Sequence, residues 1–367
     1  MQPAELIPEQ PDPIVSAALF ILLALVLILP FRVRWVEENL EPFFLVMGVI
    51  SLLITSTVAP ILTPELVIHA LESPIGIVKI DGIPVLGIFQ VVLIIGLIIH
   101  FYNRQIYSAL VTFMQKVGLR FFVFFFVVFF GLISSVISVI VCSVILAEIA
   151  LAMPLERRKK VEFIVIACFA VGMGAALTPV GEPLSTIAVR KLNADFFYLL
   201  RLIGHYIISG VLALGVYAVF RVGSSRVESV ELPVYEETLR TVVVRAFRVY
   251  MFVTALELLG AGCTPLIVWY ISKVPAEALY WINMVSAFLD NATLTAAEIG
   301  PTLTEQQIKS ALMGLIISGG MLIPGNIPNI IAAARMKITM KDWARIGVPL
   351  GLVIMIVYFL IIHVLGL

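Results

Sequence analysis

The fold is decided by two apolar segments: GMGAALTPVGEPLSTIAVRKLNADFF, from Gly172 to Phe197, and SGGMLIPGNIPNIIAAARMKITMKDW, from Ser318 to Trp343. Each segment is interrupted by a cluster of proline, glycine and polar residues. In both, an arginine (Arg190 or Arg335) follows the second proline of the cluster by seven residues. We interpret the two segments as copies of one repeated unit that occurs in each half of the chain.

The composition around these segments is that of a membrane protein. Of the 367 residues, 61% are apolar and 13% are charged, whereas soluble globular proteins have about 45–50% apolar and about 25% charged residues. Lys plus Arg equals Asp plus Glu at 24 each, so no excess of charge indicates a nucleic acid partner. The expected partners are the lipid bilayer and small inorganic ions, and no cofactor is expected.

Eight apolar segments are expected to cross the bilayer, because a hydrocarbon core about 30 Å thick needs roughly 20 helical residues. They are 13–31, 43–62, 84–101, 161–190, 197–220, 246–271, 309–335 and 345–366. The run 119–154 is too long for one crossing and too short for two, and 279–300 has a charged centre. We interpret both as re-entrant hairpins, whose backbone at that depth must be covered by protein or line a cavity.

The distribution of basic residues supports this layout. It puts 18 of the 24 Lys and Arg residues on one side of the membrane, which is then the cytoplasmic side. Both termini are accordingly expected outside. The predicted location is the cytoplasmic (inner) membrane of the cell, with multiple passes.

The predicted fold is an all-α polytopic membrane protein with an inverted repeat, two re-entrant hairpins and two broken helices. Each unit contains a crossing, a hairpin and two more crossings, and this odd number of crossings gives the two units opposite topology. The predicted parts are extra N-terminal helices (1–83), a first repeat (84–221), a cytoplasmic linker (222–245) and a second repeat (246–367). Within the first repeat, 102–118 is either an amphipathic helix at the membrane interface or an ordinary connector.

The proline and glycine clusters are candidate binding sites, since they remove helical hydrogen bonds in the middle of a crossing. A helix broken there exposes amides and carbonyls, and a bound ion can be their partner. The first cluster, 178–183, has Thr178, Gly181 and Glu182, followed by Ser185. The second cluster, 324–329, has Asn326 and Asn329.

Asp290 is the clearest functional candidate, because a charged residue in the middle of a membrane usually belongs to an ion or proton pathway. It lies with Ser286, Asn291 and Thr293 in an apolar stretch at the expected tip of the second hairpin. Carboxylate, amide and hydroxyl oxygens suit a hard cation, so Asp290, Asn291 and Thr293 are the predicted metal ligands. The carboxyl can hold a proton when the cation is absent. The alternative is a buried aspartate with a purely structural role.

Other acids have less decisive positions. Glu182 is either a second ligand or proton carrier, or a structural residue of the first break, and Glu257 is either a proton relay or a hydrogen-bonding group. Glu148 and Glu298 are expected near hairpin ends, in contact with solvent or the interface. The first hairpin has its tip at Ser134-Ser135 if its apolar run is centred, or near Ser143 if Glu148 is aligned with Glu298.

At these residues the chain resembles the ion transporter superfamily, which includes NhaD-type sodium/proton antiporters, arsenite pumps and dicarboxylate transporters. The resemblance covers roughly 84–366 and depends on SAFLDNAT (286–293), TPVGEP (178–183) and PGNIPN (324–329). It is also similar to a small prokaryotic family described as candidate cation transporters. The resemblance implies a homodimer, with 13–62 or 84–118 at its interface, and these ligands: Asp290, Asn291, Thr293, Thr178, Gly181, Asn326 and Asn329.

Two departures from the superfamily argue against a carboxylate substrate: the first hairpin lacks the Ser-Asn-Thr tripeptide of the dicarboxylate branch, and Glu182 replaces a usually neutral residue. The predicted function is a secondary active transporter, a Na⁺/H⁺ antiporter that works by alternating access. The alternatives are a carrier of an anion (arsenite or an organic acid), coupled to Na⁺ or driven by the membrane potential, and a divalent-cation transporter. An enzyme is not expected, because HExxH and GxSxG are absent from the sequence and an aspartyl protease needs two carboxyls that share a proton.

Overall fold

The protein is described by a computed structural model in which helices form nearly all of the regular structure. It describes residues 6–8, 10–75, 79–80, 83–84, 88–137, 139–192, 194–223, 238–271, 274–289, 291–300 and 303–366. The strands in this part of the chain are two antiparallel pieces of two residues each, β1 (Lys79–Ile80) and β2 (Ile83–Pro84). The N-terminal helices are α1 (Pro13–Arg32), α2 (Arg34–Glu38), α3 (Leu40–Thr55), α4 (Pro64–Glu72) and η2 (Ser73–Ile75).

The remaining helices are divided between the two halves of the chain. The first half has α5 (Ile88–Val117), α6 (Leu119–Ile137), α7 (Val139–Ala152), α8 (Arg157–Ala175), α9 (Pro183–Lys191) and α10 (Tyr198–Arg221). The second half has α11 (Leu239–Leu266), η3 (Ile267–Ile271), α12 (Ala276–Ile282), η4 (Asn283–Ala287), α13 (Asn291–Glu298), α14 (Glu305–Gly319), η5 (Ile323–Gly325), α15 (Ile327–Met336), α16 (Met340–Phe359) and η6 (Leu360–Val364).

Within the described residues, 5 helices are long and apolar enough to cross a membrane. They are Pro13–Arg32, Leu119–Ile137, Tyr198–Arg221, Leu239–Tyr270 and Met340–Val364. The chain is thus a helical protein with several apolar helices of membrane-spanning length. The first, third, fourth and fifth coincide with expected crossings, whereas Leu119–Ile137 is α6, the first arm of an expected hairpin.

The expected crossings 161–190 and 309–335 are each divided into two helices. Helix α8 ends at Ala175 and α9 begins only at Pro183, while α14 ends at Gly319 and α15 begins at Ile327. The prolines explain where the second helices begin, since a proline in the first turn loses no helical hydrogen bond. The Pro-Gly clusters therefore interrupt the helices in both segments.

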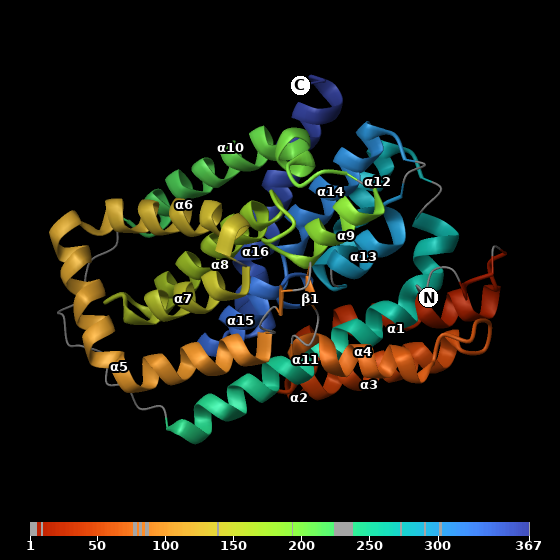
Figure 1. The fold of residues 1–367 in the computed structure, drawn as a ribbon, viewed down its shortest axis with the longest axis horizontal. Helices are drawn as coiled ribbons and strands as arrows, with labels where there is room; N and C mark the ends of the chain where they lie inside the picture. Colours follow the sequence, from red (N-terminus) through yellow and green to blue (C-terminus); the bar gives the residue numbers. More distant parts are fainter. Residues whose placement is uncertain are drawn as a thin grey trace.

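The expected hairpins each contain two helical arms. Helices α6 and α7 pack against each other, whereas α12 packs against η4, and α13 packs against α9, α11, α14 and η3. The second helix of each expected hairpin also packs against the other half of the chain. Helix α7 lies along α15, and α13 lies along α9 (Figure 1). The two halves are thereby interlocked.

In the first expected hairpin, α6 ends at Ile137 and α7 begins at Val139. These helix ends lie nearer in the sequence to the Ser134-Ser135 alternative than to Ser143. Ser143 lies inside α7, where its Oγ donates to the carbonyl oxygen of Val139 at 2.5 Å. Ser134 is also helical, and its Oγ donates to the carbonyl oxygens of Gly131 and Val171.

The segment 102–118 continues α5 as a helix after a kink at Tyr102, whose backbone is non-helical (φ −114°, ψ 16°). Figure 1 shows α5 turning sharply between its two segments. Phe113 packs against the rings of Phe122 and Phe126 of α6. The proposed linker is also shorter than expected, because α11 begins at Leu239, within 222–245.

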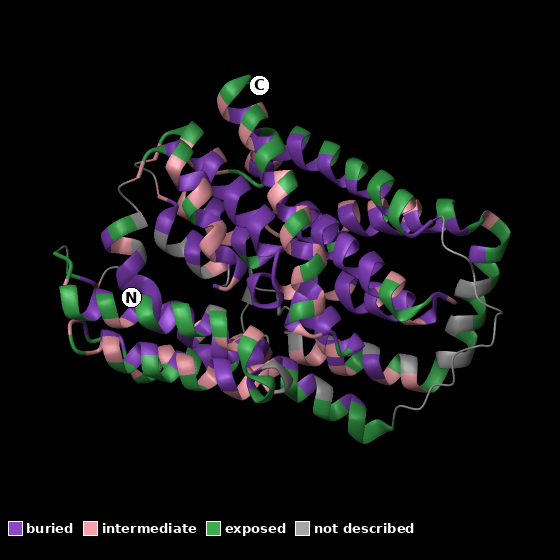
Figure 2. Ribbon diagram, turned by 180° about the vertical axis from the view of Figure 1, so that it is seen from behind, coloured by how far each residue is buried: buried purple, intermediate pink, exposed green. Residues whose placement is uncertain are grey.

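Buried residues gather along the middle of the molecule, and exposed residues lie on its outer helices (Figure 2). Helix α8 is buried at every position from Val161 to Ala175. Glycines allow the closest contacts: a Cβ atom at Gly174 would lie 1.6 Å from the carbonyl oxygen of Gly131 in α6. Small residues at helix contacts are typical of membrane bundles, in which close packing replaces the hydrophobic effect.

Candidate functional site: two helix breaks and the hairpins that hold them

The first break is held by the tip of the first hairpin. Thr178 donates its hydroxyl to the carbonyl oxygen of Ser135, and the backbone N–H of Val139 donates to the carbonyl oxygen of Gly181 at 2.9 Å. Gly181 also lies so close to the end of α8 that a Cβ atom there would be 2.0 Å from the carbonyl oxygen of Ala175. Only glycine fits at this position.

The second break is held by Asn329. Its Nδ2 donates to the carbonyl oxygens of Gly319 and Leu322, both at 2.8 Å. These carbonyls follow the end of α14, where helical partners are missing. The Asn329 side chain is completely buried, and its Oδ1 has no hydrogen-bond partner among the described residues. This amide therefore satisfies the break with its donors and leaves an acceptor inside the protein.

Backbone oxygens from the second hairpin and the second break converge at Gly325. A Cβ atom there would lie 2.5 Å from the carbonyl oxygen of Gly319 and 2.6 Å from that of Ser286. The carbonyl oxygen of Ala287 would be 3.0 Å away. The absence of a side chain at Gly325 is what lets these polar groups approach.

Two predicted site residues of the second hairpin reach the same place. A Cβ atom at Gly319 would lie 3.5 Å from Oγ of Ser286 and 3.6 Å from Nδ2 of Asn291. Both side chains are buried, and Nδ2 of Asn291 has no hydrogen-bond partner among the described residues. Ser286, Asn291 and Asn329 thus gather around Gly319 and Gly325. We call these five residues the polar cluster.

The first broken helix lies beside the second break. A Cβ atom at Gly172 of α8 would be 2.4 Å from Nδ2 of Asn326, and Sγ of Cys168 lies 3.5 Å from the carbonyl oxygen of Pro328. Farther along the chain, α9 packs against α13. Ser185 of α9 is fully buried, and its Oγ lacks a partner among the described residues.

The remaining predicted residues are Asp290, Thr293, Glu182 and Glu257. Asp290 lies outside the described residues, as does the side chain of Thr293, although its backbone belongs to α13. Glu182 is buried beside the first break. Glu257 has partners in another part of the chain: it accepts a hydrogen bond from Ser73, and His69 Nδ1 is 3.2 Å from its Oε2.

The expectation that Glu148 and Glu298 are solvated or interfacial is wrong, since both are buried. Glu148 of α7 accepts two hydrogen bonds from the guanidinium of Arg335 in α15, one of them at 2.7 Å. Glu298 of α13 accepts one from Nδ2 of Asn283 at 2.9 Å. The matching Leu-Ala-Glu-Ile and Ala-Ala-Glu-Ile sequences could have marked both acids as core positions.

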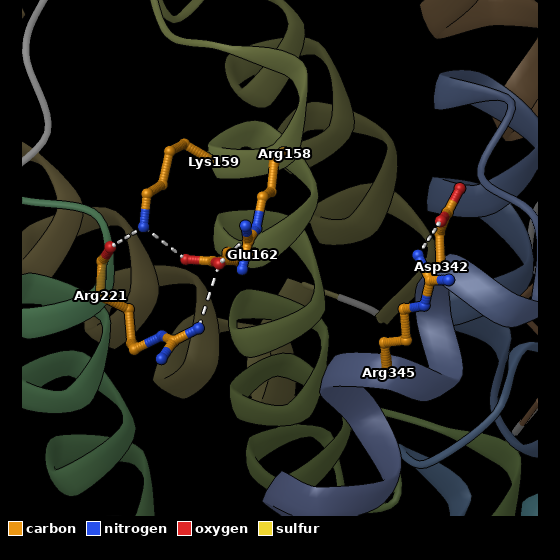
Figure 3. Close-up of polar contacts among 6 residues, drawn as sticks. All are labelled: Arg158, Lys159, Glu162, Arg221, Asp342 and Arg345. Carbon is orange, nitrogen blue, oxygen red and sulfur yellow. Dashed lines mark hydrogen bonds and ion pairs between the residues drawn. The ribbon is translucent and has the colours of Figure 1, made fainter.

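A further buried acid lies near the basic beginning of α8. Glu162 is 2% exposed and lies 2.9 Å from Lys159 Nζ, 3.0 Å from Arg221 and 3.5 Å from Arg158 (Figure 3). Cations at the N-terminal end of a helix oppose its dipole, and the Glu162 carboxylate offsets that cost. Figure 3 also shows a second ion pair, which lies apart from this group. In that pair, Nη1 of Arg345 is 3.7 Å from Oδ1 of Asp342.

Comparison with known proteins gives one family. Residues 16–365 match the model of a family described as "Protein of unknown function (DUF1646)". A search of curated proteins gave no match. The match includes both breaks, both hairpin segments and α1 from residue 16 on, so it extends over the N-terminal helices and the two halves.

Proposed function

The chain belongs to the family described as "Protein of unknown function (DUF1646)", and we propose that it is a secondary active transporter that exchanges Na⁺ for protons by alternating access. The polar cluster carries this proposal. Its buried carbonyl, hydroxyl and amide groups lie between the second break and the second hairpin of a strongly apolar chain. Oxygen atoms are the ligands that hard cations prefer.

In this proposal Asp290 supplies the charge that binds either Na⁺ or a proton. It directly precedes Asn291, a member of the polar cluster, in the sequence. The other cation ligands are Asn291 and Thr293, assisted by Ser286, Asn326 and Asn329. In this proposal the first break and the beginning of α9 contribute Thr178, Gly181, Glu182 and Ser185.

Inverted repeats of opposite topology would supply the alternating access. The matching order of helices in the two halves and the paired contacts of α7 with α15 and α13 with α9 support such a repeat. Transporters of this architecture bind their substrate near the middle of the membrane, between broken helices. Movement of one half against the other would open the polar cluster to each side in turn.

The ion pair between Arg335 and Glu148 favours a cation over an anion as the transported substrate. An arsenite or carboxylate carrier needs a positive or donor-rich pocket, and Arg335 follows the second break closely. Its guanidinium is bonded to the Glu148 carboxylate, so its charge is already compensated. The anion carrier and the divalent-cation transporter therefore remain second to Na⁺/H⁺ exchange. Neither Glu257 nor a resident cofactor has a part in this mechanism.

We further propose a homodimer in the cytoplasmic membrane, with both termini outside and with 13–62 or 84–118 at the dimer contact. Helix α3 packs along α11, and its other face exposes Val46, Val49 and Leu53. Single cysteines at these three exposed positions should form intermolecular crosslinks in membranes if 13–62 is the interface. Cysteines on the exposed face of α5, at Ile94 and Ile98, test the second region.

The test of exchange is transport by the purified full chain in proteoliposomes that contain a pH-sensitive dye. A Na⁺ or Li⁺ gradient is expected to move protons in the wild type, and K⁺ is the control cation. Asp290→Asn should abolish exchange, while Asp195→Asn, at an exposed loop position, should leave it intact. Normal exchange by Asp290→Asn, or no proton movement in the wild type, contradicts the proposal.

A further inference from the structure

The pair formed by Glu298 and Asn283 joins the two arms of the second hairpin. Asn283 belongs to η4 and is completely buried, and Glu298 belongs to the last turn of α13 and is 6% exposed. Nδ2 of Asn283 donates to Oε2 of Glu298 at 2.9 Å and to the carbonyl oxygen of Ala311 at 3.2 Å. Both amide hydrogens are therefore used.

The atoms that remain are two acceptors. Neither Oε1 of Glu298 nor Oδ1 of Asn283 has a hydrogen-bond partner among the described residues. Exchanging the oxygen and nitrogen of the amide does not help, because its oxygen would then face two acceptors. Buried polar atoms are rarely left unsatisfied, and a carboxylate away from water normally has a cationic partner or is neutral.

We propose that Glu298 is a proton-binding residue of the transporter, and that the proton on its Oε1 is donated to Oδ1 of Asn283. The carboxylic acid and the amide would then be joined by two hydrogen bonds, Nδ2–H to Oε2 and Oε1–H to Oδ1. A hydronium ion transfers one proton to Oε1 of the carboxylate and becomes water, and no other bond changes. The proposal deepens the proposed exchange and rests on it for the proton's role in transport.

Charged groups near this pair do not replace the proton. Helix α13 packs against α9, α11, α14 and η3. The charged residues of α9 and α14, together with the one nearest the end of α11, are Arg190, Lys191, Glu305, Lys309 and Glu257. Glu257 is bonded to Ser73 and His69, and Lys309 lies 5.6 Å from the ring centre of Tyr206. The side chain of Arg190 is outside the described residues, and no ion pair of Glu298 is found among those that are described.

The corresponding acid of the first hairpin provides the contrast. Glu148 is 3% exposed, but both its oxygens accept hydrogen bonds from the Arg335 guanidinium. Its charge is compensated by a permanent cation. The two equivalent acids are equally buried but differ in their partners, because one has an arginine and the other has an amide. Of the two, only Glu298 has an oxygen without a hydrogen-bond partner among the described residues.

Infrared spectroscopy tests the protonation independently of transport. The purified full chain, labelled with ¹³C at its glutamate carboxyls, should give a protonated carboxyl band at neutral pH that shifts with the label. Glu298→Gln, which keeps the shape of the acid, should remove this band, whereas Glu277→Gln, at an exposed position of α12, should retain it. The labelled wild type gives a result even if a variant fails to fold. Absence of the band in the wild type, or its persistence in Glu298→Gln, overturns the proposal.

A transport assay tests whether the proton on Glu298 takes part in the exchange. Glu298→Gln is expected to reduce Na⁺-driven proton movement at least tenfold and to remove its dependence on pH, and Glu298→Asp should restore part of it. If the band is present but wild-type vesicles show no exchange, the proposed exchange fails and Glu298 remains a protonated acid. If Glu298→Gln loses the band but exchanges normally, the exchange stands and the transport role of Glu298 is overturned.

Discussion

Arg335 of α15 donates two hydrogen bonds to the carboxylate of Glu148 in α7, and both side chains are more than nine-tenths buried. The pair connects residues from opposite halves of the chain, 187 positions apart. Because the guanidinium and carboxylate match in geometry, the contact is bidentate, which is the strongest form of an ion pair. It fixes the first hairpin to the second broken helix.

Removing one partner of this pair should destabilise the protein strongly. Glu148→Ala leaves a buried guanidinium without its counter-charge, and such losses cost about 3–5 kcal/mol. We expect a large fall in the melting temperature of the detergent-purified protein. The double variant Glu148→Leu with Arg335→Met removes both charges and should be more stable than Glu148→Ala alone. An additive loss in the double variant contradicts the pairing.

Gly174→Ala should prevent α8 from packing against α6. The new methyl group would lie 1.6 Å from the carbonyl oxygen of Gly131, and backbone cannot move aside as a side chain can. Overpacking usually costs about 1–3 kcal/mol, and this contact is more severe than usual. Yield of folded protein by size-exclusion chromatography measures the effect. Gly300→Ala is the matched control, since nothing lies within 4 Å of a Cβ atom there.

Asn329→Ala should weaken both the fold and Na⁺ binding. It leaves the carbonyl oxygens of Gly319 and Leu322 without the donor that they have now, at a cost of about 1–3 kcal/mol for each unsatisfied buried group. We expect lower thermal stability and a smaller stabilisation by added Na⁺. Asn329→Asp retains the size but loses the donors, so it should behave as Asn329→Ala. Wild-type stability in Asn329→Asp would show that the donors are unimportant.

The loop before α10 gives a prediction about pH. A hydrogen bond from Arg201 holds the pKa of the Asp195 carboxyl below its usual value. A lowered pKa in the folded state adds stability above the ordinary pKa, and that stability is lost as pH falls through the lowered value. The wild type should therefore be only slightly more stable than Arg201→Gln at neutral pH, because the pair is exposed. This difference in stability should vanish in acid. Thermal unfolding at several pH values measures it.

The sequence predicted the positions of the helix breaks because proline and glycine act locally. Both Pro-Gly clusters interrupt helices where they were expected, and α10, α11 and α16 overlap crossings that were expected from the sequence. The partners of the acids were not predictable in the same way. Glu148 meets Arg335 only through the packing of α7 against α15, which no local pattern encodes.

The kink at Tyr102 falls at the expected boundary between the crossing 84–101 and the segment 102–118. The polar neighbours of Gly325, in contrast, were missed. Gly325 was recognised as a helix breaker, but its contact with Ser286 depends on how η4 meets η5. Helix positions thus follow from residue type, whereas the site depends on distant contacts. Asp290 as a cation ligand stays a prediction.

The interlocked arms impose an order on biogenesis. When α7 and α9 leave the ribosome, the helices that will cover them, α15 and α13, have not been synthesised. A nascent first half would lack Arg335, the cation that compensates the Glu148 carboxylate in the folded protein. Assembly of this protein must then be completed after translation, when α13 and α15 pack against α9 and α7 of the first half.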